Sequence, residues 1–265
     1  MTRSPAQILE QLLCQDRLWL FLDYDGTLAD FAPTPESVVT DPEVISIVTR
    51  LALCPRVRVA VISGRPLKQI QQLLPISHIW LAGTYGVEVQ TPGGEILQRA
   101  EWKVIRPALE RLKPFWRQLI ADRTGFFLED KGWALALHGR FAHDAEADQV
   151  LSAASTSTGM LASSGEFRLL PSSHFLEICP IIAHKGRTVN YVLDRFAWPG
   201  ALPVYLGDDD KDEDAFEAIK AHHGVALLVA AILRTTRADA QLGSPQAARD
   251  WLTQLVERLS VKEPL

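Results

Sequence analysis

Three short apolar runs that each end abruptly in polar residues constrain the fold of this 265-residue chain most strongly. The runs are residues 18–22, Val57–Ile62 and 204–206, and each is followed directly by residues such as Asp, Ser and Gly. Apolar runs of this length that stop at turn residues are typical of buried strands. Because segments with helical spacing separate several such runs, we expect a parallel sheet with helices on both faces.

The first hundred residues alternate strand and helix signals. Asp41 followed by Pro42 is typical of a helix start, because the Asp side chain can cap the first turn and Pro fits the first helical position. Apolar residues then recur at helical spacing, namely Val44, Ile47, Val48 and Leu51. We also expect a short helix over 67–74 and a third strand over 78–82.

The middle of the chain has a different pattern. One apolar helix face is predicted from Trp102, Ile105, Leu109, Leu112, Trp116 and Leu119. Pro107 and Pro114 lie off this face and should kink or split the helix. A first hairpin is expected from strands at 126–130 and 133–138, followed by a helix over Asp144–Ser157. A second hairpin is expected from strands at 166–170 and 174–178, which turn around Pro171-Ser172-Ser173.

The strand and helix alternation returns near the end of the chain. Helices are predicted over 188–195 and 214–220, strands over 204–206 and Val225–Val229, and a last helix after Ser244-Pro245. We therefore predict an α/β fold, with a doubly wound, Rossmann-like parallel-sheet core formed by residues 1–100 and 181–265. An α+β domain with an antiparallel sheet is inserted at residues 101–180.

Composition excludes several functional classes. Lys and Arg number 27 and Asp and Glu 32, so the formal charge of −5 gives no electrostatic footprint for nucleic acid or an anionic membrane. No apolar run reaches the roughly 18 residues of a membrane span, and the first eleven residues lack the layout of a secretory signal. Three separated cysteines without a C-x-x-C pattern argue against a disulfide framework or a zinc site. We expect small buried cysteines in a cytoplasmic protein without nucleic-acid or membrane partners.

Acidic residues follow two of the predicted strands, at Asp23 and Asp25 and at Asp208, Asp209 and Asp212. In an open parallel sheet, ligands bind at the carboxyl ends of the strands. Carboxylates gathered there form an oxygen-rich site for a hard cation such as Mg²⁺, which commonly keeps a substrate phosphate in its shell. A plain turn is the alternative for each cluster alone, since Asp and Gly favour turns, but two such clusters favour a cation site.

These residues amount to a resemblance to the haloacid-dehalogenase (HAD) superfamily of phosphotransferases. Its first motif resembles Asp23-Tyr24-Asp25-Gly26-Thr27-Leu28, its second Ser63-Gly64-Arg65, its third Lys185-Gly186 and its fourth residues 207–216. The extended fourth motif, with residues 81–86 and 177–180, is similar to the trehalose-6-phosphate phosphatases, whose insert is a C2-type cap. The resemblance spans roughly residues 18–252.

The resemblance implies a Mg²⁺-dependent phosphatase with an aspartyl-phosphate intermediate. Asp23 would be the nucleophile, Asp25 the general acid and base, and Lys185 a catalytic positive charge. The phosphate would be bound by Thr27, Ser63, Gly64 and Lys185. The metal would be bound by Asp23, Asp25 through its backbone carbonyl, Asp208 and Asp212, the last either as a direct ligand or as an orienting group.

The family's cap signature resembles Glu129-Asp130-Lys131 and His138-Gly139-Arg140. The substrate-binding set implied by the resemblance is Arg65, Glu129, Lys131, His138, Arg140 and Glu177. A solvated hairpin face is the alternative interpretation of the cap residues. Three positions depart from the family pattern. Lys211 stands where the family usually has Thr, Cys179 where it has Arg, and His184 where it has Asn, Asp or Ser. The simplest interpretation of Lys211 is a solvated side chain.

The resemblance implies trehalose 6-phosphate, a small sugar phosphate, as the substrate, and a trehalose-phosphate synthase as a partner in the same pathway. One alternative is a phosphatase for the phosphate of glucosylglycerol, mannosylglycerate or sucrose. A second is a non-catalytic partner of a trehalose-phosphate synthase, which the presence of both Asp23 and Asp25 argues against. A sugar-phosphate mutase is the third.

Overall fold

The structure is a computed structural model that describes residues 3–31 and 38–261. The chain divides into two compact units, one comprising the chain up to Leu97 and from His184 onward, the other Gln98–Ala183. Within the described ranges, no helix combines the length and apolar character needed to cross a membrane.

An eight-stranded sheet, in the order β12-β11-β10-β1-β2-β3-β4-β5, forms the centre of the first unit. Its strands are β1 (Arg17–Leu22), β2 (Val57–Ile62), β3 (Trp80–Gly83), β4 (Glu88–Gln90), β5 (Ile96–Gln98), β10 (Ala201–Gly207), β11 (Val225–Val229) and β12 (Ala240–Leu242). The pairs from β12 to β3 are parallel, whereas β3 and β4 are antiparallel. Leu22 pairs with Leu206 on one side and Val61 on the other, so the carboxyl ends of β10, β1 and β2 adjoin.

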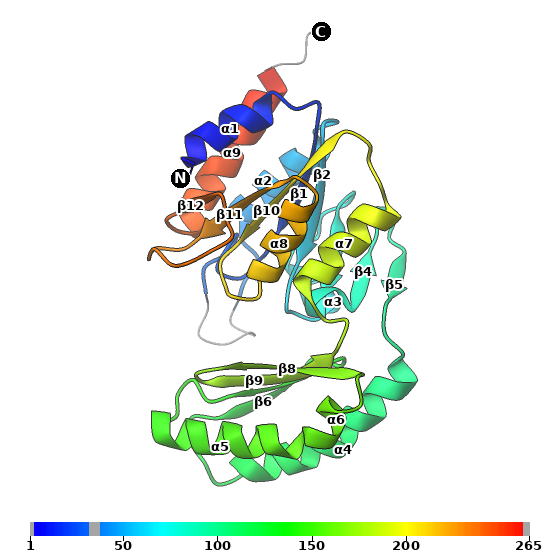
Figure 1. The fold of residues 1–265 in the computed structure, drawn as a ribbon, viewed down its shortest axis with the longest axis vertical. Helices are drawn as coiled ribbons and strands as arrows, with labels where there is room; N and C mark the ends of the chain where they lie inside the picture. The colour runs from blue at the N-terminus through cyan, green and yellow to red at the C-terminus, as the bar shows by residue number, and fades with distance from the viewer. Residues whose placement is uncertain (1–2, 32–37, 262–265) are drawn as a thin grey trace. The chain divides into compact units, whose positions relative to one another are not determined.

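Helices cover both faces of this sheet, as Figure 1 shows. They are α1 (Pro5–Leu13), α2 (Pro42–Leu53), α3 (Leu67–Leu73), α7 (Lys185–Arg195), α8 (Glu213–Ala221) and α9 (Pro245–Val261). Alternate residues of β1 enter two separate cores: Leu20 packs with the apolar residues of α1, α2, α3 and α9, and Phe21 with those of α7 and α8. This alternation confirms the predicted doubly wound α/β fold.

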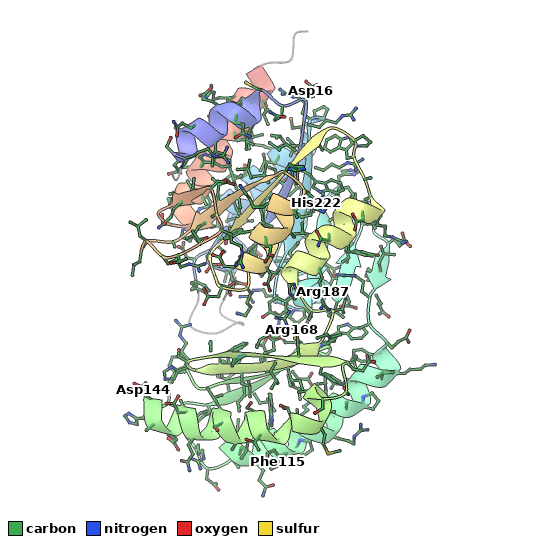
Figure 2. All side chains as sticks on the ribbon, viewed as in Figure 1. Asp16, Phe115, Asp144, Arg168, Arg187 and His222 are labelled. Carbon is green, nitrogen blue, oxygen red and sulfur yellow. The ribbon has the colours of Figure 1, made fainter. Side chains whose placement is uncertain are left out.

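The second unit has a four-stranded antiparallel sheet in the order β6-β7-β9-β8. Its elements are α4 (Trp102–Ile120), β6 (Phe127–Asp130), β7 (Leu135–His138), α5 (Asp144–Ser157), α6 (Gly159–Ala162), β8 (Phe167–Ser172) and β9 (Phe175–Pro180). Helices α4 and α5 lie on one face of the sheet, and Phe115 lies on the outer side of α4 (Figures 1 and 2). The predicted α+β pattern is therefore confirmed.

Two local details in this unit differ from expectation. The predicted split of helix α4 is wrong: α4 is one element with Pro107 and Pro114 inside it. Both prolines lie on exposed positions, so water can bind the carbonyls that lose their helical donors. The second hairpin turns at residues 173–174, because β8 continues through Pro171 to Ser172; an edge strand tolerates a residue without an N–H.

None of the three cysteines, all of which lie in the described residues, forms a disulfide, and only Cys179 is fully buried. Cys54 is partly buried and Cys14 is exposed, so the expectation of buried packing holds for one of the three. The helix predicted after Asp41 is confirmed: α2 begins at Pro42, and the Asp41 side chain accepts a hydrogen bond from the Glu43 N–H at 2.8 Å.

Candidate active site

The side chain of Lys185 joins the acidic residues that follow β1 and β10. Its Nζ lies 2.8 Å from Asp23 Oδ1 and 2.7 Å from Asp212 Oδ1. Lys185 is the first residue of α7, and all three side chains are buried. Burial alone would lower the pKa of Lys185, but Asp212 and Asp23 raise it well above its usual value, so the amine stays charged.

Asp23, Asp208 and Asp212 each offer a carboxylate oxygen within 4.8 Å of the others. Burial raises the pKa of Asp23 to about 8 and that of Asp208 to about 6, and nearby carboxylates add to both shifts. Burial likewise raises the pKa of Asp212 to about 8. A divalent cation would stabilise the ionised form of crowded carboxylates whose pKa values are raised. This set of oxygen donors therefore fits a hard metal ion.

Asp212 is held by hydrogen bonds at both oxygens. Oδ1 accepts from Lys185 and from the Tyr205 hydroxyl at 2.6 Å, and Oδ2 accepts from the backbone N–H groups of Asp208 and Asp209, each at 3.1 Å. These bonds fix the turn that carries Asp208, an arrangement that suits an orienting group better than a direct metal ligand.

Thr27 also faces the carboxylates. Its hydroxyl oxygen lies 3.2 Å from Asp23 Oδ2 and 3.3 Å from Asp208 Oδ1, which links the loops after β1 and β10. A hydroxyl has one proton to donate, so it can serve one of these oxygens at a time.

Asp25 does not join the three carboxylates through its side chain but pairs with Arg65. The Arg65 Nε lies 3.0 and 2.8 Å from the two Asp25 oxygens, and Nη2 lies 2.6 Å from Oδ1. A guanidinium held on both oxygens of a carboxylate fixes its orientation. Arg65, which the resemblance assigns to substrate binding, thus contacts the side chain of Asp25 in this structure.

The loop after β2 is held from both sides. Ser63 Oγ accepts a hydrogen bond from the Arg65 N–H at 3.1 Å, and the Ser63 carbonyl accepts one from the Tyr85 N–H at 2.8 Å. A Cβ on Gly64 would lie 2.8 Å from the Tyr85 ring. Thr84 and Tyr85 both have positive φ, 47° and 56°, a strained conformation for residues with side chains that is common at functional sites.

Gly26 allows the loop after β1 to pass against Asp208. Its φ is +80°, and a Cβ at this position would lie 2.4 Å from Asp208 Oδ2. A side chain here would both strain the backbone and push the carboxylate away.

Gly26→Ala is therefore expected to destabilise the protein by about 1–3 kcal/mol and to weaken cation binding. The measurements are thermal unfolding and a Mg²⁺ titration of activity. Gly94→Ala is the matched control, because Gly94 also has a positive φ, +86°, but a Cβ there meets nothing within 4 Å. Equal Mg²⁺ requirements in the two variants would show that Gly26 matters only for its backbone conformation.

The second unit gathers four of the predicted substrate-binding side chains. The strand register places Glu129, Ala136 and Glu177 in one cross-strand row, and Phe127, His138 and Phe175 in the next row on the same face. We call Glu129, Lys131, His138 and Glu177 the cap cluster. His138 Nε2 lies 3.0 Å from Glu129 Oε2, and Lys131 Nζ lies 3.0 Å from Glu177 Oε1 and 4.0 Å from Glu129 Oε2.

Aromatic and charged neighbours fix the cap cluster. The Phe127 ring stacks on His138 with centroids 4.1 Å apart, and Phe175 meets His138 edge-on at 5.1 Å. Burial alone would lower the pKa of Lys131, but Glu177 and Glu129 raise it. The cluster is therefore an ordered set of hydrogen-bonding groups beside aromatic rings.

Arg140, the remaining predicted cap residue, is exposed two residues beyond β7. Cys179, where the family usually has Arg, pairs in the sheet with Arg168, and Cys179 Sγ lies 3.8 Å from the Arg168 carbonyl. Figure 2 shows Arg168 on the face of the sheet opposite α4 and α5.

The sequence model of the trehalose-phosphatase family matches residues 21–246 of the chain. The chain belongs to the trehalose-phosphatase family. It is 31% identical over 248 residues to the trehalose-phosphate phosphatase of Mycobacterium bovis, covering 91% of this chain but 61% of that protein. The chain thus spans about three fifths of the length of this curated relative.

Solved structures share the trehalose-phosphatase fold of this chain. The C-terminal domain of a Candida albicans trehalose-6-phosphate phosphatase aligns with a TM-score of 0.83 at 19% identity, covering 97% of this chain and 98% of that one. The C-terminal domain of a Candida albicans trehalose synthase regulatory protein aligns at 0.77 and 12% identity, covering 95% and 98%. A protein described as regulatory has this fold too, so the fold alone does not show catalysis.

Sequence reasoning missed two residues that contact the site. Tyr205 lies inside β10, where the apolar pattern predicts a core residue. Only its hydrogen bond to Asp212 shows a polar role. Arg234 lies in the segment between β11 and β12 and contacts the carbonyl oxygens of Asp208 and Asp209. No motif or spacing in the sequence marks either residue.

Proposed function

We propose that this member of the trehalose-phosphatase family is a Mg²⁺-dependent phosphatase that hydrolyses trehalose 6-phosphate to trehalose and phosphate. The observation that carries the proposal is the buried contact of Lys185 with both Asp23 and Asp212, with Asp208 beside them. These residues place a nucleophile, a fixed positive charge and oxygen ligands for a cation beside one another. Phosphoryl transfer needs such positioning and electrostatic stabilisation.

In the first proposed step, an Asp23 carboxylate oxygen attacks phosphorus. The bond between phosphorus and the sugar oxygen breaks, and Asp25 donates a proton to that oxygen as trehalose leaves. In the second step, Asp25 accepts a proton from a water molecule whose oxygen attacks phosphorus. The bond between phosphorus and the Asp23 carboxylate oxygen breaks, and inorganic phosphate leaves with the Asp23 carboxylate restored.

The remaining residues of the first unit have proposed supporting roles. Lys185 holds Asp23 in place and places positive charge beside the phosphate. The Thr27 and Ser63 hydroxyls and the Gly64 backbone are the proposed phosphate donors. We assign Arg65 to orienting Asp25, because its guanidinium engages both oxygens of that carboxylate.

The proposed cation ligands are Asp23, Asp208 and the backbone carbonyl of Asp25, with Asp212 as the group that orients the turn. A bound Mg²⁺ would supply positive charge that offsets the repulsion between an anionic nucleophile and an anionic phosphate. The donor set contains oxygens only, which favours Mg²⁺ over Zn²⁺.

We propose that the cap cluster, together with Arg140, binds the sugar. Its carboxylates and ammonium can exchange hydrogen bonds with several hydroxyl groups, and the rings of Phe127 and Phe175 give apolar contact surface beside them.

Glu129→Ala and His138→Ala should each lower kcat/KM for trehalose 6-phosphate by about 10- to 1000-fold, on the scale of one or two charge-assisted hydrogen bonds. Hydrolysis of p-nitrophenyl phosphate, which has no sugar, should change little. The readout is the ratio of the two activities in each variant.

Glu146→Ala is the matched control, because Glu146 is in the same unit but pairs with Arg123 at 2.8 Å away from the cap cluster. It should leave both activities within about 2-fold. A parallel fall of both activities in the Glu129 and His138 variants would mean that these residues serve the fold or the phosphate chemistry, and the sugar assignment would fail.

We further propose a cytoplasmic location, because none of the three cysteines, all of which the structure describes, forms a disulfide. A trehalose-phosphate synthase is the proposed source of the substrate. The proposed location rests on general redox chemistry, and the proposed synthase rests on the substrate assignment above. The catalytic proposal depends on neither.

A further inference from the structure

The backbone of the acidic turn at Asp208–Asp212 is fixed from two sides. On its N–H side, Asp212 Oδ2 accepts from the N–H groups of Asp208 and Asp209. Asp209 Oδ1 accepts from those of Lys211 and Asp212 at 2.8 and 3.2 Å. These carboxylates bind the backbone donors of the turn but cannot bind its carbonyl groups.

Arg234 occupies the carbonyl side of the same turn. Its Nη2 donates to the carbonyl oxygens of Asp208 and Asp209 at 3.3 and 3.1 Å. Its Nη1 lies 2.8 Å from Asp210 Oδ1 and 3.3 Å from Glu213 Oε1. One guanidinium therefore makes four contacts with consecutive parts of the acidic segment, which its planar fork of donors permits.

The segment that carries Arg234 is itself tied to the sheet. The Gln241 side chain donates to the carbonyl oxygens of Ala230 and Ile232 at 2.6 and 3.3 Å. The Arg237 N–H donates to Glu213 Oε2 at 2.8 Å. Arg234 thus connects the acidic turn to an anchored part of the chain more than twenty residues away.

We propose that Arg234 is a positioning residue that holds the backbone of the acidic turn and thereby keeps Asp208 in place for a divalent cation. The inference rests on the proposed function for its cation site. Arg234 does not contact the carboxylates of Asp23, Asp208 or Asp212 and acts through the main chain of Asp208 and Asp209.

The sign of the effect separates this role from simple charge balance. A guanidinium near a cation site repels the cation, so its removal should tighten cation binding if charge alone mattered. If Arg234 positions the turn, its removal should weaken binding, because Asp208 is no longer held ready for the metal. The two explanations predict opposite changes in the dissociation constant.

The test uses Mn²⁺ as a spectroscopic probe for the Mg²⁺ site, with its binding to the whole protein measured by electron paramagnetic resonance in the absence of substrate. Arg234→Gln should raise the Mn²⁺ dissociation constant by about 10-fold or more, within the range expected when a supporting partner of a metal site is lost. Arg234→Lys keeps the charge but cannot bridge the same oxygens, and should also weaken binding, by a smaller factor.

Arg237→Gln is the matched control. It removes the same charge from the same segment, but the Arg237 side chain pairs with Glu217 at 3.5 Å and does not contact the acidic turn. Its Mn²⁺ dissociation constant should stay within about 2-fold of the wild-type value. Circular dichroism establishes that each variant is folded, and if Arg234→Gln is not, the Arg234→Lys comparison decides.

Unchanged or tighter Mn²⁺ binding by Arg234→Gln would overturn the inference, as would wild-type binding by Arg234→Lys. An equal loss of affinity in Arg237→Gln would also overturn it, since the effect would then belong to the segment as a whole. Absence of Mn²⁺ binding by the wild-type protein is a different result: it would refute the proposed cation site itself.

Discussion

Asp23→Asn is expected to lower kcat for trehalose 6-phosphate by at least about 10⁴-fold, a loss typical of removing a nucleophile. The amide cannot attack phosphorus and gives a cation no negative charge. The fold should survive, because Asn has nearly the same shape and because burial already disfavours the charged form of Asp23. Phosphate release and thermal unfolding of the same preparation measure both effects.

Asp16→Asn is the control for this experiment. Asp16 is exposed and lies just before β1, at the opposite end of the strand from Asp23, and Figure 2 labels it. The control variant should keep wild-type turnover. Substantial turnover by folded Asp23→Asn, free of wild-type contamination, would refute the covalent mechanism.

Removal of divalent cations is expected to lower phosphate release by at least about 10³-fold, and Mg²⁺ should restore it. The reason lies in the buried carboxylates, since burial raises the pKa of Asp23 to about 8 and that of Asp208 to about 6 in the absence of a cation. Protons therefore compete with the metal, and the Mg²⁺ concentration for half-maximal activity should rise as the pH falls from 8 to 6.

The measurement is phosphate release after treatment with EDTA, followed by titration with Mg²⁺ at several pH values. Zn²⁺ should restore activity poorly, because the proposed ligands are oxygens without His or Cys. Full activity in protein shown by elemental analysis to be free of metal would contradict the cation site.

The sequence predicted the centre of the fold and of the site because both follow from where strands end. An apolar run that stops at Asp23 and another that stops at Gly207 predict neighbouring strands with carboxylates at one edge, and the register of β1 and β10 places them there. Lys185 had no such signal of its own, and the family resemblance supplied it.

Contacts between distant segments were beyond sequence reasoning. Tyr205 is one of several apolar or aromatic residues in β10, and only the neighbouring position of Asp212 gives its hydroxyl a partner. Arg65 follows Ser63 in a motif, but the distance to Asp25 depends on how two loops meet. The split expected at the prolines in α4 does not occur, and sequence alone does not tell how the carbonyl groups that lose a donor there are solvated.

The most direct test of the central claim is phosphate release by the purified protein from a panel of substrates, with and without Mg²⁺. The panel is trehalose 6-phosphate, sucrose phosphate, glucosylglycerol phosphate and mannosylglycerate phosphate, with glucose 1,6-bisphosphate added in one arm to reveal a mutase. We predict that trehalose 6-phosphate has the highest kcat/KM of the panel. Its hydrolysis should require Mg²⁺ but not glucose 1,6-bisphosphate. No phosphate release from trehalose 6-phosphate by folded, Mg²⁺-loaded protein, or a higher kcat/KM for another member of the panel, would contradict the account.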